Sequence, residues 1–156
     1  MNILLTGGAG YIGSHTATVL MQAGHKVIIY DNFSNSSKNV IDRLEEVAGT
    51  KVSLIEGDIR NTKLLTETLQ QFSVDSVIHF AGLKAVGESV KIPLTYYENN
   101  VQGTLSLLGA MAEQKVSNIV FSSSATVYGD PQYLPIDEAH PLAPTSPYGR
   151  TKLQMN

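Results

Sequence analysis

The sequence contains no cysteine among its 156 residues, which excludes disulfides, thiol catalysis and thiolate metal sites. The four histidines, His15, His25, His79 and His140, show no metal-ligand spacing with one another, so we predict no metal site. Long hydrophobic runs are also lacking, since none approaches the ~18 residues that span a bilayer. Met1 leads directly into a strand-like segment rather than a signal core. These absences predict a soluble, cytoplasmic protein.

A large excess of charge of one sign is lacking as well. Lys and Arg number 11 against 14 Asp and Glu, for a net charge of −3, and no run of basic residues occurs. The sequence therefore offers nothing for a nucleic-acid backbone or an anionic membrane to bind. What is present, 42% hydrophobic and 16% charged residues, is typical of one globular domain, which we expect to span residues 1–156.

Strand-like and helix-like segments alternate along the chain, which predicts an α/β fold with a doubly wound parallel sheet (Rossmann fold). Strands are predicted at 2–6, 26–30, 52–56, 76–80 and 118–121, and helices after residue 10, at 38–48, 61–72, 93–114 and from 146 to the end. The helix from Pro93 is expected to turn Tyr97, Val101, Leu105 and Leu108 inward. A sixth strand is missing, so we expect an incomplete sheet.

Three glycines spaced three apart, Gly7, Gly10 and Gly13, follow the first strand-like run and open a helix. In such a turn, backbone N–H groups and the helix N-terminus can hold a pyrophosphate. Glycine-rich turns also join strands to helices for steric reasons alone. Asp31 favours the nucleotide interpretation, because it ends the second apolar run, where a carboxylate can accept hydrogen bonds from an adenosine ribose.

Residues 80–84 form a second turn from a strand into a glycine, and in a doubly wound sheet it faces the first turn at the strands' carboxyl ends. Asn99 and Asn100 lie inside a predicted helix, where amides usually point to solvent, and a ligand role is the alternative. Five of the six prolines lie within residues 131–147, which predicts a long rigid loop. Loops this long are usually functional or disordered.

Tyr148 and Lys152 are one helical turn apart and therefore share a face of the last predicted helix. An ammonium beside a phenol favours the phenolate, which would make the tyrosine a base. Such a pair taken alone is more typical of a solvated surface. The other motifs of the chain, among them the three serines at residues 122–124 that end the last predicted strand, favour the tyrosine base over a surface pair.

Five features together resemble the extended short-chain dehydrogenase/reductases: segments 6–13, 58–60, 80–84 and 122–129, and the Tyr148 and Lys152 pair. Within that family they are similar to bacterial enzymes that epimerise UDP-glucose and UDP-galactose at C4. The resemblance covers the whole chain and implies that these residues are the N-terminal, NAD-binding half of a longer protein. It also implies a nucleotide-sugar domain beyond them and a homodimer for the full-length protein.

The resemblance assigns NAD binding to Gly7, Gly10, Tyr11, Ile12, Gly13, Asp31, Asn32, Asn35, Ser36, Asp58, Ile59, Phe80, Ala81, Gly82, Leu83, Lys84, Asn99, Ser124, Tyr148 and Lys152. The glycine turn would hold the pyrophosphate, and residues 58 and 59 the adenine. Ser124 and Tyr148 would face the UDP-sugar, and Lys152 would join them as the catalytic set. Without a ligand, Asp58 also fits a loop acid, Phe80 a core aromatic, and the three serines a polar strand end.

The reaction that the resemblance implies removes the proton of the sugar 4-hydroxyl to Tyr148 while hydride passes from C4 to NAD and later returns. Another nucleotide-sugar epimerase, a dehydratase, a non-catalytic NAD-binding module and a structural subunit are the alternatives. Dehydratases of the family carry an Asp-Glu pair where Ala125 and Thr126 stand. A binding module has no need of the tyrosine, lysine and serine together.

Overall fold

The computed structural model describes residues 1–155, and the chain divides into two compact units. The sheet unit comprises Met1–Ala81 and Leu105–Ser122, and the helical unit comprises Gly82–Thr104 and the chain from Ser123 onward. Each unit is described by itself below.

The sheet unit contains one sheet of five parallel strands. They are β1 (Asn2–Thr6), β2 (Lys26–Asp31), β3 (Ser53–Glu56), β4 (Ser76–His79) and β5 (Asn118–Phe121), in the order β3-β2-β1-β4-β5. The chain first moves from β1 to β2 and β3, and then resumes on the other side of β1 with β4 and β5. This reversal makes the carboxyl ends of β1 and β4 the switch point at which doubly wound sheets bind ligands.

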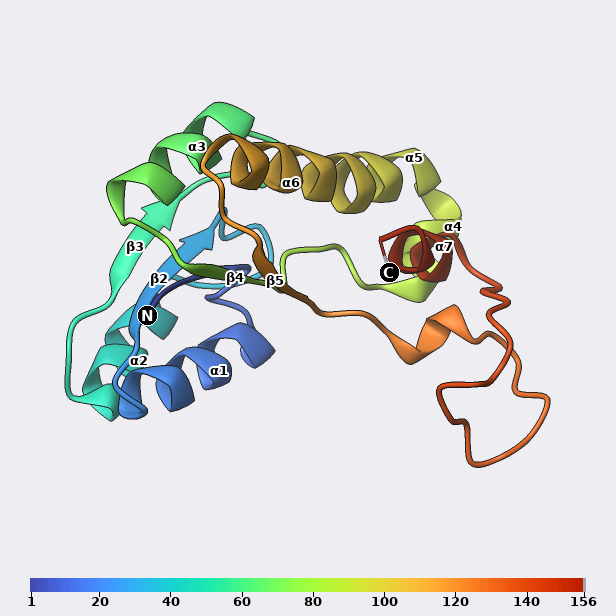
Figure 1. Ribbon diagram of the computed structural model, residues 1–156. Coiled ribbons are helices and arrows are strands. Elements are labelled where there is room, and N and C mark those ends of the chain that lie inside the picture. Colours follow the sequence, from blue (N-terminus) through green and yellow to red (C-terminus); the bar gives the residue numbers. More distant parts are fainter. Residues whose placement is uncertain (156) are drawn as a thin grey trace. The chain divides into compact units, whose positions relative to one another are not determined.

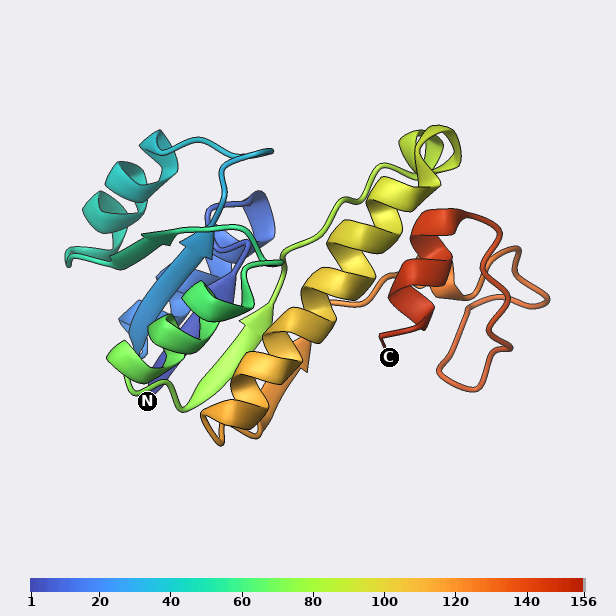
Figure 2. The same ribbon diagram turned by 90° about the horizontal axis from the view of Figure 1, so that it is seen from above.

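Helices cover both faces of the sheet, as the alternating segments predict (Figure 1). Helices α1 (Tyr11–Gln22) and α2 (Asn39–Ala48) lie on one face, and α3 (Thr62–Gln71) and α6 (Gly103–Glu113) lie on the other, which Figure 2 shows from above. Successive strand residues point to opposite faces. Ile3 and Leu5 therefore join the core beneath α1 and α2, whereas Leu4 joins the core beneath α3 and α6.

The helical unit contains short helices: α4 (Val86–Lys91), α5 (Pro93–Tyr96), a π-helical turn (Tyr97–Gln102), a 3₁₀ turn (Ala125–Val127) and α7 (Pro147–Leu153). Helix α7 begins as predicted, because the Ser146 hydroxyl accepts the N–H of Gly149 at 3.0 Å and Pro147 occupies the first turn. It ends at Leu153, earlier than predicted, and Asn156 lies outside the described residues.

The predicted inward face of the long helix is wrong, because Leu105 is 55% and Leu108 is 40% exposed. The buried face lies one residue earlier and includes polar side chains such as Asn100 and Thr104. These polar groups are buried because they are hydrogen-bonded: the Thr104 hydroxyl donates to the Asn100 carbonyl at 2.6 Å. A prediction that considers apolar residues alone therefore selects the exposed apolar face of this helix instead of the buried one.

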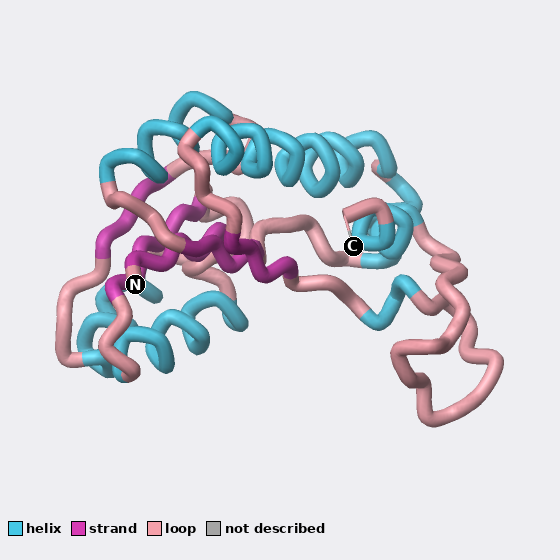
Figure 3. Tube along the Cα trace, viewed as in Figure 1, coloured by secondary structure: helices cyan, strands magenta, loops and turns pink. Residues whose placement is uncertain are grey.

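Residues 128–146, between the 3₁₀ turn and α7, form a loop without helix or strand, as the prolines predict (Figure 3). Within residues 1–155, none of the helices is long and apolar enough to cross a membrane.

Candidate cofactor and catalytic site

The glycine turn after β1 is built so closely that it excludes side chains. Gly7 has a φ of +68°, and a Cβ placed on it would lie 2.6 Å from the backbone nitrogen of Ala81, in the turn that follows β4. A Cβ on Gly13 would lie 2.5 Å from the Gly7 carbonyl oxygen, so α1 packs directly on the turn. The two strand exits therefore meet at the switch point, as the sequence predicts.

The N-terminal end of α1 faces this turn with its backbone donors. Gly10 is the N-cap residue and makes no side-chain cap hydrogen bond. The following Tyr11 and Ile12 are 77% and 56% exposed. Because the first N–H groups of a helix have no partner within it, this end suits the anionic pyrophosphate expected there.

Asp31 ties the glycine turn to the loop after β2. Its carboxylate accepts the N–H of Ala9 at 3.0 Å, the N–H of Phe33 at 2.9 Å and the hydroxyl of Ser36 at 3.0 Å. The side chain is buried, with 8% exposed. Asp31 and Ser36, both predicted ribose contacts, are thus brought together, whereas Asn35 lies exposed in the same loop.

Asp58 forms an ion pair with Arg60, whose Nε and Nη2 each donate to the carboxylate at 2.8 Å. These hydrogen bonds hold the pKa of Asp58 well below its usual range. The predicted adenine residues reach Asn32, since its amide donates to Asp58 at 3.3 Å. Ile59 is buried in the hydrophobic core, so a contact with adenine would come from its backbone.

The second predicted turn, at residues 80–84, crosses from the sheet unit into the helical unit. Phe80 packs against the core beneath α1 and α2, and its N–H donates to the Thr6 carbonyl at 2.9 Å. In the helical unit, Leu83 is held at both backbone groups by Asn100: its N–H donates to Oδ1 at 2.8 Å, and its carbonyl accepts from Nδ2 at 2.9 Å. Lys84 is exposed beside it.

Asn100 also reaches α7, which makes it the link between the turn and the helix that carries Tyr148 and Lys152. Its Nδ2 donates to the Thr151 hydroxyl at 3.1 Å, and that hydroxyl donates to the Tyr148 carbonyl at 2.7 Å. Asn99, the predicted ligand, donates to Asn100 Oδ1 at 3.0 Å. Asn100 was not among the predicted site residues, although its four-residue spacing from Tyr96 and Thr104 places it on the buried face.

Tyr148 and Lys152 are buried in the helical unit, with 8% and 6% exposed, and this contradicts the surface interpretation of the pair. Lys152 Nζ lies 3.6 Å from the position that a Cβ on Gly82 would occupy. Burial lowers the pKa of Lys152 to about 8. The Tyr96 ring meets the Tyr148 ring edge to face, with centroids 6.4 Å apart.

Ser124 caps the 3₁₀ turn, and its hydroxyl accepts the Thr126 N–H at 3.3 Å and the Thr126 hydroxyl at 2.9 Å. Since Ser124 accepts both bonds, its own hydrogen can be donated to another oxygen. This turn packs on α7, because a Cβ on Gly149 would lie 2.8 Å from the Thr126 carbonyl oxygen.

The predicted site residues are divided between the two units. The sheet unit carries Gly7, Gly10, Tyr11, Ile12, Gly13, Asp31, Asn32, Asn35, Ser36, Asp58, Ile59, Phe80 and Ala81, and the helical unit carries Gly82, Leu83, Lys84, Asn99, Ser124, Tyr148 and Lys152. Within the described residues, no group of three or more His, Asp or Glu side chains could hold a metal ion.

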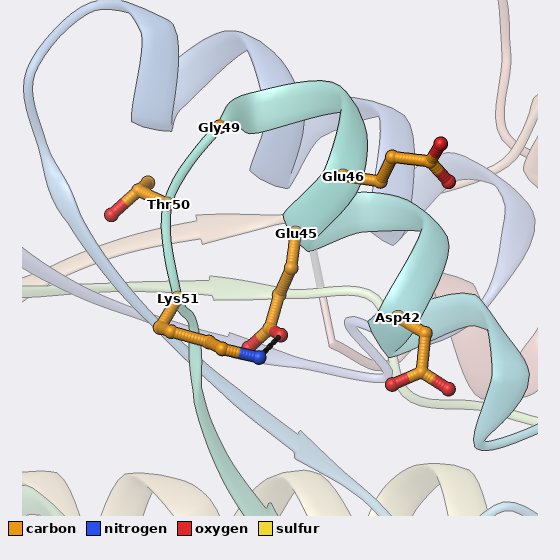
Figure 4. Close-up of a pocket in the computed structure, with 6 residues that line it drawn as sticks. All are labelled: Asp42, Glu45, Glu46, Gly49, Thr50 and Lys51. Carbon is orange, nitrogen blue, oxygen red and sulfur yellow. Dashed lines mark hydrogen bonds and ion pairs between the residues drawn. The ribbon is translucent and has the colours of Figure 1, made fainter.

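A hollow at the C-terminal end of α2 is lined by none of the predicted site residues (Figure 4). Its lining residues are Asp42, Glu45, Glu46, Gly49, Thr50 and Lys51. Lys51 donates to Glu45 at 2.6 Å, and this contact lowers the pKa of Glu45. The hollow therefore contains an internally paired charge rather than an arranged set of ligands.

Comparison with known proteins identifies relatives along the whole chain. The family model described as GDP-mannose 4,6 dehydratase matches residues 4–156. The UDP-glucose 4-epimerase of Dictyostelium discoideum is 56% identical over 151 residues, which are 97% of this chain and 44% of that protein. The UDP-glucose 4-epimerase of Bacillus subtilis (strain 168) is 50% identical over 155 residues, 99% of this chain and 46% of that protein.

Solved structures agree. The UDP-glucose 4-epimerase from Bifidobacterium longum, in complex with NAD+ and UDP, superimposes with a TM-score of 0.97 at 48% identity, covering 99% of this chain and 46% of that one. The enzyme from Stenotrophomonas maltophila, with bound NAD and formylated UDP-arabinopyranose, gives 0.97 at 47% identity over the same shares. The chain thus spans about half the length of the relatives it matches. With the model match over residues 4–156 and the identities above, the chain belongs to the extended short-chain dehydrogenase/reductase family, within the group that includes the UDP-glucose 4-epimerases.

Proposed function

We propose that this chain forms the NAD-binding and catalytic half of an enzyme that interconverts UDP-glucose and UDP-galactose by transient oxidation at C4 of the sugar. The observation that carries the proposal is the buried pair on α7: Tyr148 and Lys152 are both over nine-tenths buried, one helical turn apart. A solvated surface pair would have no reason to be buried in this way. The similar enzymes named above support the choice of substrate.

The residues of the sheet unit fit NAD. Gly7 and Gly13 form a turn that any Cβ would fill, which lets a pyrophosphate approach the backbone. The uncapped N-terminus of α1 offers N–H donors to its negative charge. Asp31, held by three chain donors, ends β2 where an adenosine ribose is expected.

When bound, NAD supplies a hydride acceptor that later returns the hydride to the sugar. Tyr148, as phenolate, takes the proton of the 4-hydroxyl, and Ser124 donates a hydrogen bond to the same oxygen. Lys152 holds its charge below its pKa of about 8. At neutral pH this positive charge would attract the negative charge that develops on the Tyr148 oxygen, and Lys152 would also hold the nicotinamide ribose when NAD is bound.

A dehydratase is the second candidate, because the matching family model carries that description. Elimination of water needs an additional acid and base, and the positions at which dehydratases carry them hold Ala125 and Thr126 here. Thr126 uses its hydroxyl on Ser124, and Ala125 has no proton to give. These two residues favour epimerisation.

The full-length protein is proposed to be a cytoplasmic homodimer, as the family resemblance implies. The exposed Leu105 and Leu108, three residues apart on α6, support a face that packs on another surface.

The proposal is tested by assaying the complete protein that carries these residues for conversion of UDP-glucose into UDP-galactose. Tyr148→Phe should lower the rate by ~100- to 10,000-fold while bound NAD is retained, because only the proton acceptor is lost. Ser124→Ala should have a severe but milder effect. Tyr133→Phe is the matched control, because it removes a phenol that donates to Asp137 in the exposed loop.

Two outcomes would contradict the proposal. Parental turnover by Tyr148→Phe would remove the tyrosine from the mechanism. Loss of water from a nucleotide sugar, without epimerisation, would make the chain part of a dehydratase.

A further inference from the structure

Ser89 lies in α4, outside every segment that the family resemblance assigns to the site. Its side chain is fully buried, with 0% exposed. The hydroxyl donates to the Val86 carbonyl at 2.6 Å and accepts the backbone N–H of Tyr148 at 3.2 Å. It therefore joins α4 to the first turn of α7, across 59 residues of sequence.

The N–H of Tyr148 needs such a partner, because the first N–H groups of a helix have no acceptor within the helix. In the first turn of α7, Pro147 has no N–H, and the N–H of Gly149 is capped by Ser146 at 3.0 Å. Tyr148 lies between them. Ser89 thus completes the capping of this turn from outside the helix.

Ser89 is itself held in place by its own helix, and Tyr96 bonds to two neighbours of Ser89, Ala85 and Glu88. Its N–H donates to the Ala85 carbonyl at 3.0 Å. The Tyr96 phenol accepts the Ala85 N–H at 3.0 Å, and lies 2.7 Å from the Glu88 carboxylate to which it donates. Burial, with the hydrogen bond to Glu88, raises the pKa of Tyr96 to about 12. The Tyr96 phenol therefore stays protonated throughout the neutral range.

Tyr148 is consequently located by three contacts. Its backbone N–H is fixed by Ser89, and its ring lies edge to face with the ring of Tyr96. Its carbonyl is fixed by Thr151, which Asn100 holds. Catalytic side chains must be held within ~0.5 Å of the productive geometry, and a shift of the main chain at this position moves the phenol directly.

On the basis of the proposed function, we propose that Ser89 is a positioning residue for the reaction, which acts through the backbone N–H of Tyr148 to place the phenol oxygen against the sugar hydroxyl. Ser89 touches neither sugar nor cofactor in this role. Its loss therefore affects the chemical step more than binding.

The test uses the complete protein with Ser89→Ala, and Thr68→Val as the matched control. Thr68 is also a buried hydroxyl, with 1% exposed, and it donates to the Leu64 carbonyl at 2.7 Å within α3 of the sheet unit. We expect Ser89→Ala to lower kcat for UDP-glucose by at least about 10-fold, with KM changed by less than about 3-fold. The pH dependence of kcat should also shift, because the phenol changes its distance from Lys152. Thr68→Val should keep the parental kcat and pH profile.

A second measurement follows the contact itself. Hydrogen exchange at the Tyr148 amide should become at least about 10-fold faster in Ser89→Ala and stay unchanged in Thr68→Val. Unchanged exchange in Ser89→Ala would overturn the contact. Faster exchange with a parental kcat and pH profile would show that Ser89 is a structural cap only. A lower apparent kcat that comes from a smaller folded fraction, with an unshifted pH profile, would show the same.

A complete protein that binds NAD but never epimerises UDP-glucose would refute the proposed function. The positioning role would fall with it, and faster amide exchange in Ser89→Ala would then show only that Ser89 caps α7. An active epimerase whose Ser89→Ala variant keeps the parental kcat and pH profile would refute the positioning role alone.

Discussion

At Asp31, one carboxylate serves the fold and the expected ligand at the same time. It accepts from Ala9 in the glycine turn and from Phe33 and Ser36 in the loop after β2. A carboxylate has about four lone-pair sites, so capacity for ribose hydroxyls remains. The sequence could predict the position of this residue from the strand end, but not the bond to Ala9, which depends on how the two loops meet.

We predict from Asp31 that the chain binds NAD in preference to NADP, by at least about 10-fold. The carboxylate would repel a 2′-phosphate, and the glycine turn carries no arginine to neutralise one. Titration of the protein with each dinucleotide measures the preference, with Ser34→Ala, exposed in the same loop, as a control that keeps the charge. Equal or tighter binding of NADP would contradict the assignment of Asp31.

Lys152 predicts a pH dependence of stability whose sign follows from its environment. Burial lowers its pKa from 10.5 to about 8 in the folded chain. Between these two values the unfolded chain binds the proton and the folded chain does not, so stability rises with pH across this window. Below pH 8 both states are protonated and the full penalty, at most about 3 kcal/mol, is present.

The measurement compares the parent with Lys152→Met, which keeps the length of the stem without the charge. Urea unfolding at about pH 7 and pH 10 should show Lys152→Met as the more stable protein at the lower pH, with the difference shrinking at the higher pH. The contributions of the other titrating groups cancel in the difference between the two free energies of unfolding, because both proteins carry these groups. A difference independent of pH would show that Lys152 is not desolvated.

At the scale of elements, the strands, their exits and the start of α7 could be predicted, whereas helix α4 could not. Strands β1 to β5 follow from apolar runs of four to six residues, and Ser146 with Pro147 marks the start of α7. Helix α4 has six residues, too few for a period to emerge. Asn100 was expected to point to solvent but is buried, because its burial depends on partners in Leu83 and Thr151 that are distant in sequence.

Asn100 is therefore expected to matter more for stability than its neighbour Asn99. Asn100→Ala removes the bonds to both backbone groups of Leu83 and to the Thr151 hydroxyl, and should lower the free energy of unfolding by about 2–4 kcal/mol. Asn99→Ala, which removes a half-buried amide that bonds to Asn100, should cost less than about 1 kcal/mol. Chemical denaturation of the two variants checks this, and equal losses would contradict the assigned role.

At the scale of the whole molecule, the alternation of strands and helices was enough to predict the parallel sheet. It was not enough to predict the division into two units, because Gly82–Thr104 leaves the sheet unit and α6 returns to it within one helical stretch. The expected phosphate and adenosine contacts lie in the sheet unit, and Tyr148 and Lys152 lie in the helical unit.

The 156-residue chain alone is predicted to bind NAD but not to epimerise UDP-glucose. It spans about 45% of the length of the relatives it matches, and we expect the rest of such a protein to complete the enclosure of a nucleotide sugar. Strand β5 ends the sheet with Val120 58% exposed, and such edges pair with other chains. Helix α7 is secured at three points, because Ser89, Ser146 and Asn100 all hold it.

We therefore attribute the expected lack of turnover to incomplete enclosure of the sugar, and not to fraying of α7. These two causes can be separated by experiment. An epimerase assay at high concentration of the chain is paired with NAD titration and hydrogen exchange at Tyr148. We expect NAD binding, a protected Tyr148 amide and no turnover, with activity gained only when the C-terminal part of a similar epimerase is added. Turnover by the chain alone would show that these residues already enclose the sugar. An unprotected amide would instead assign the inactivity to a loose α7.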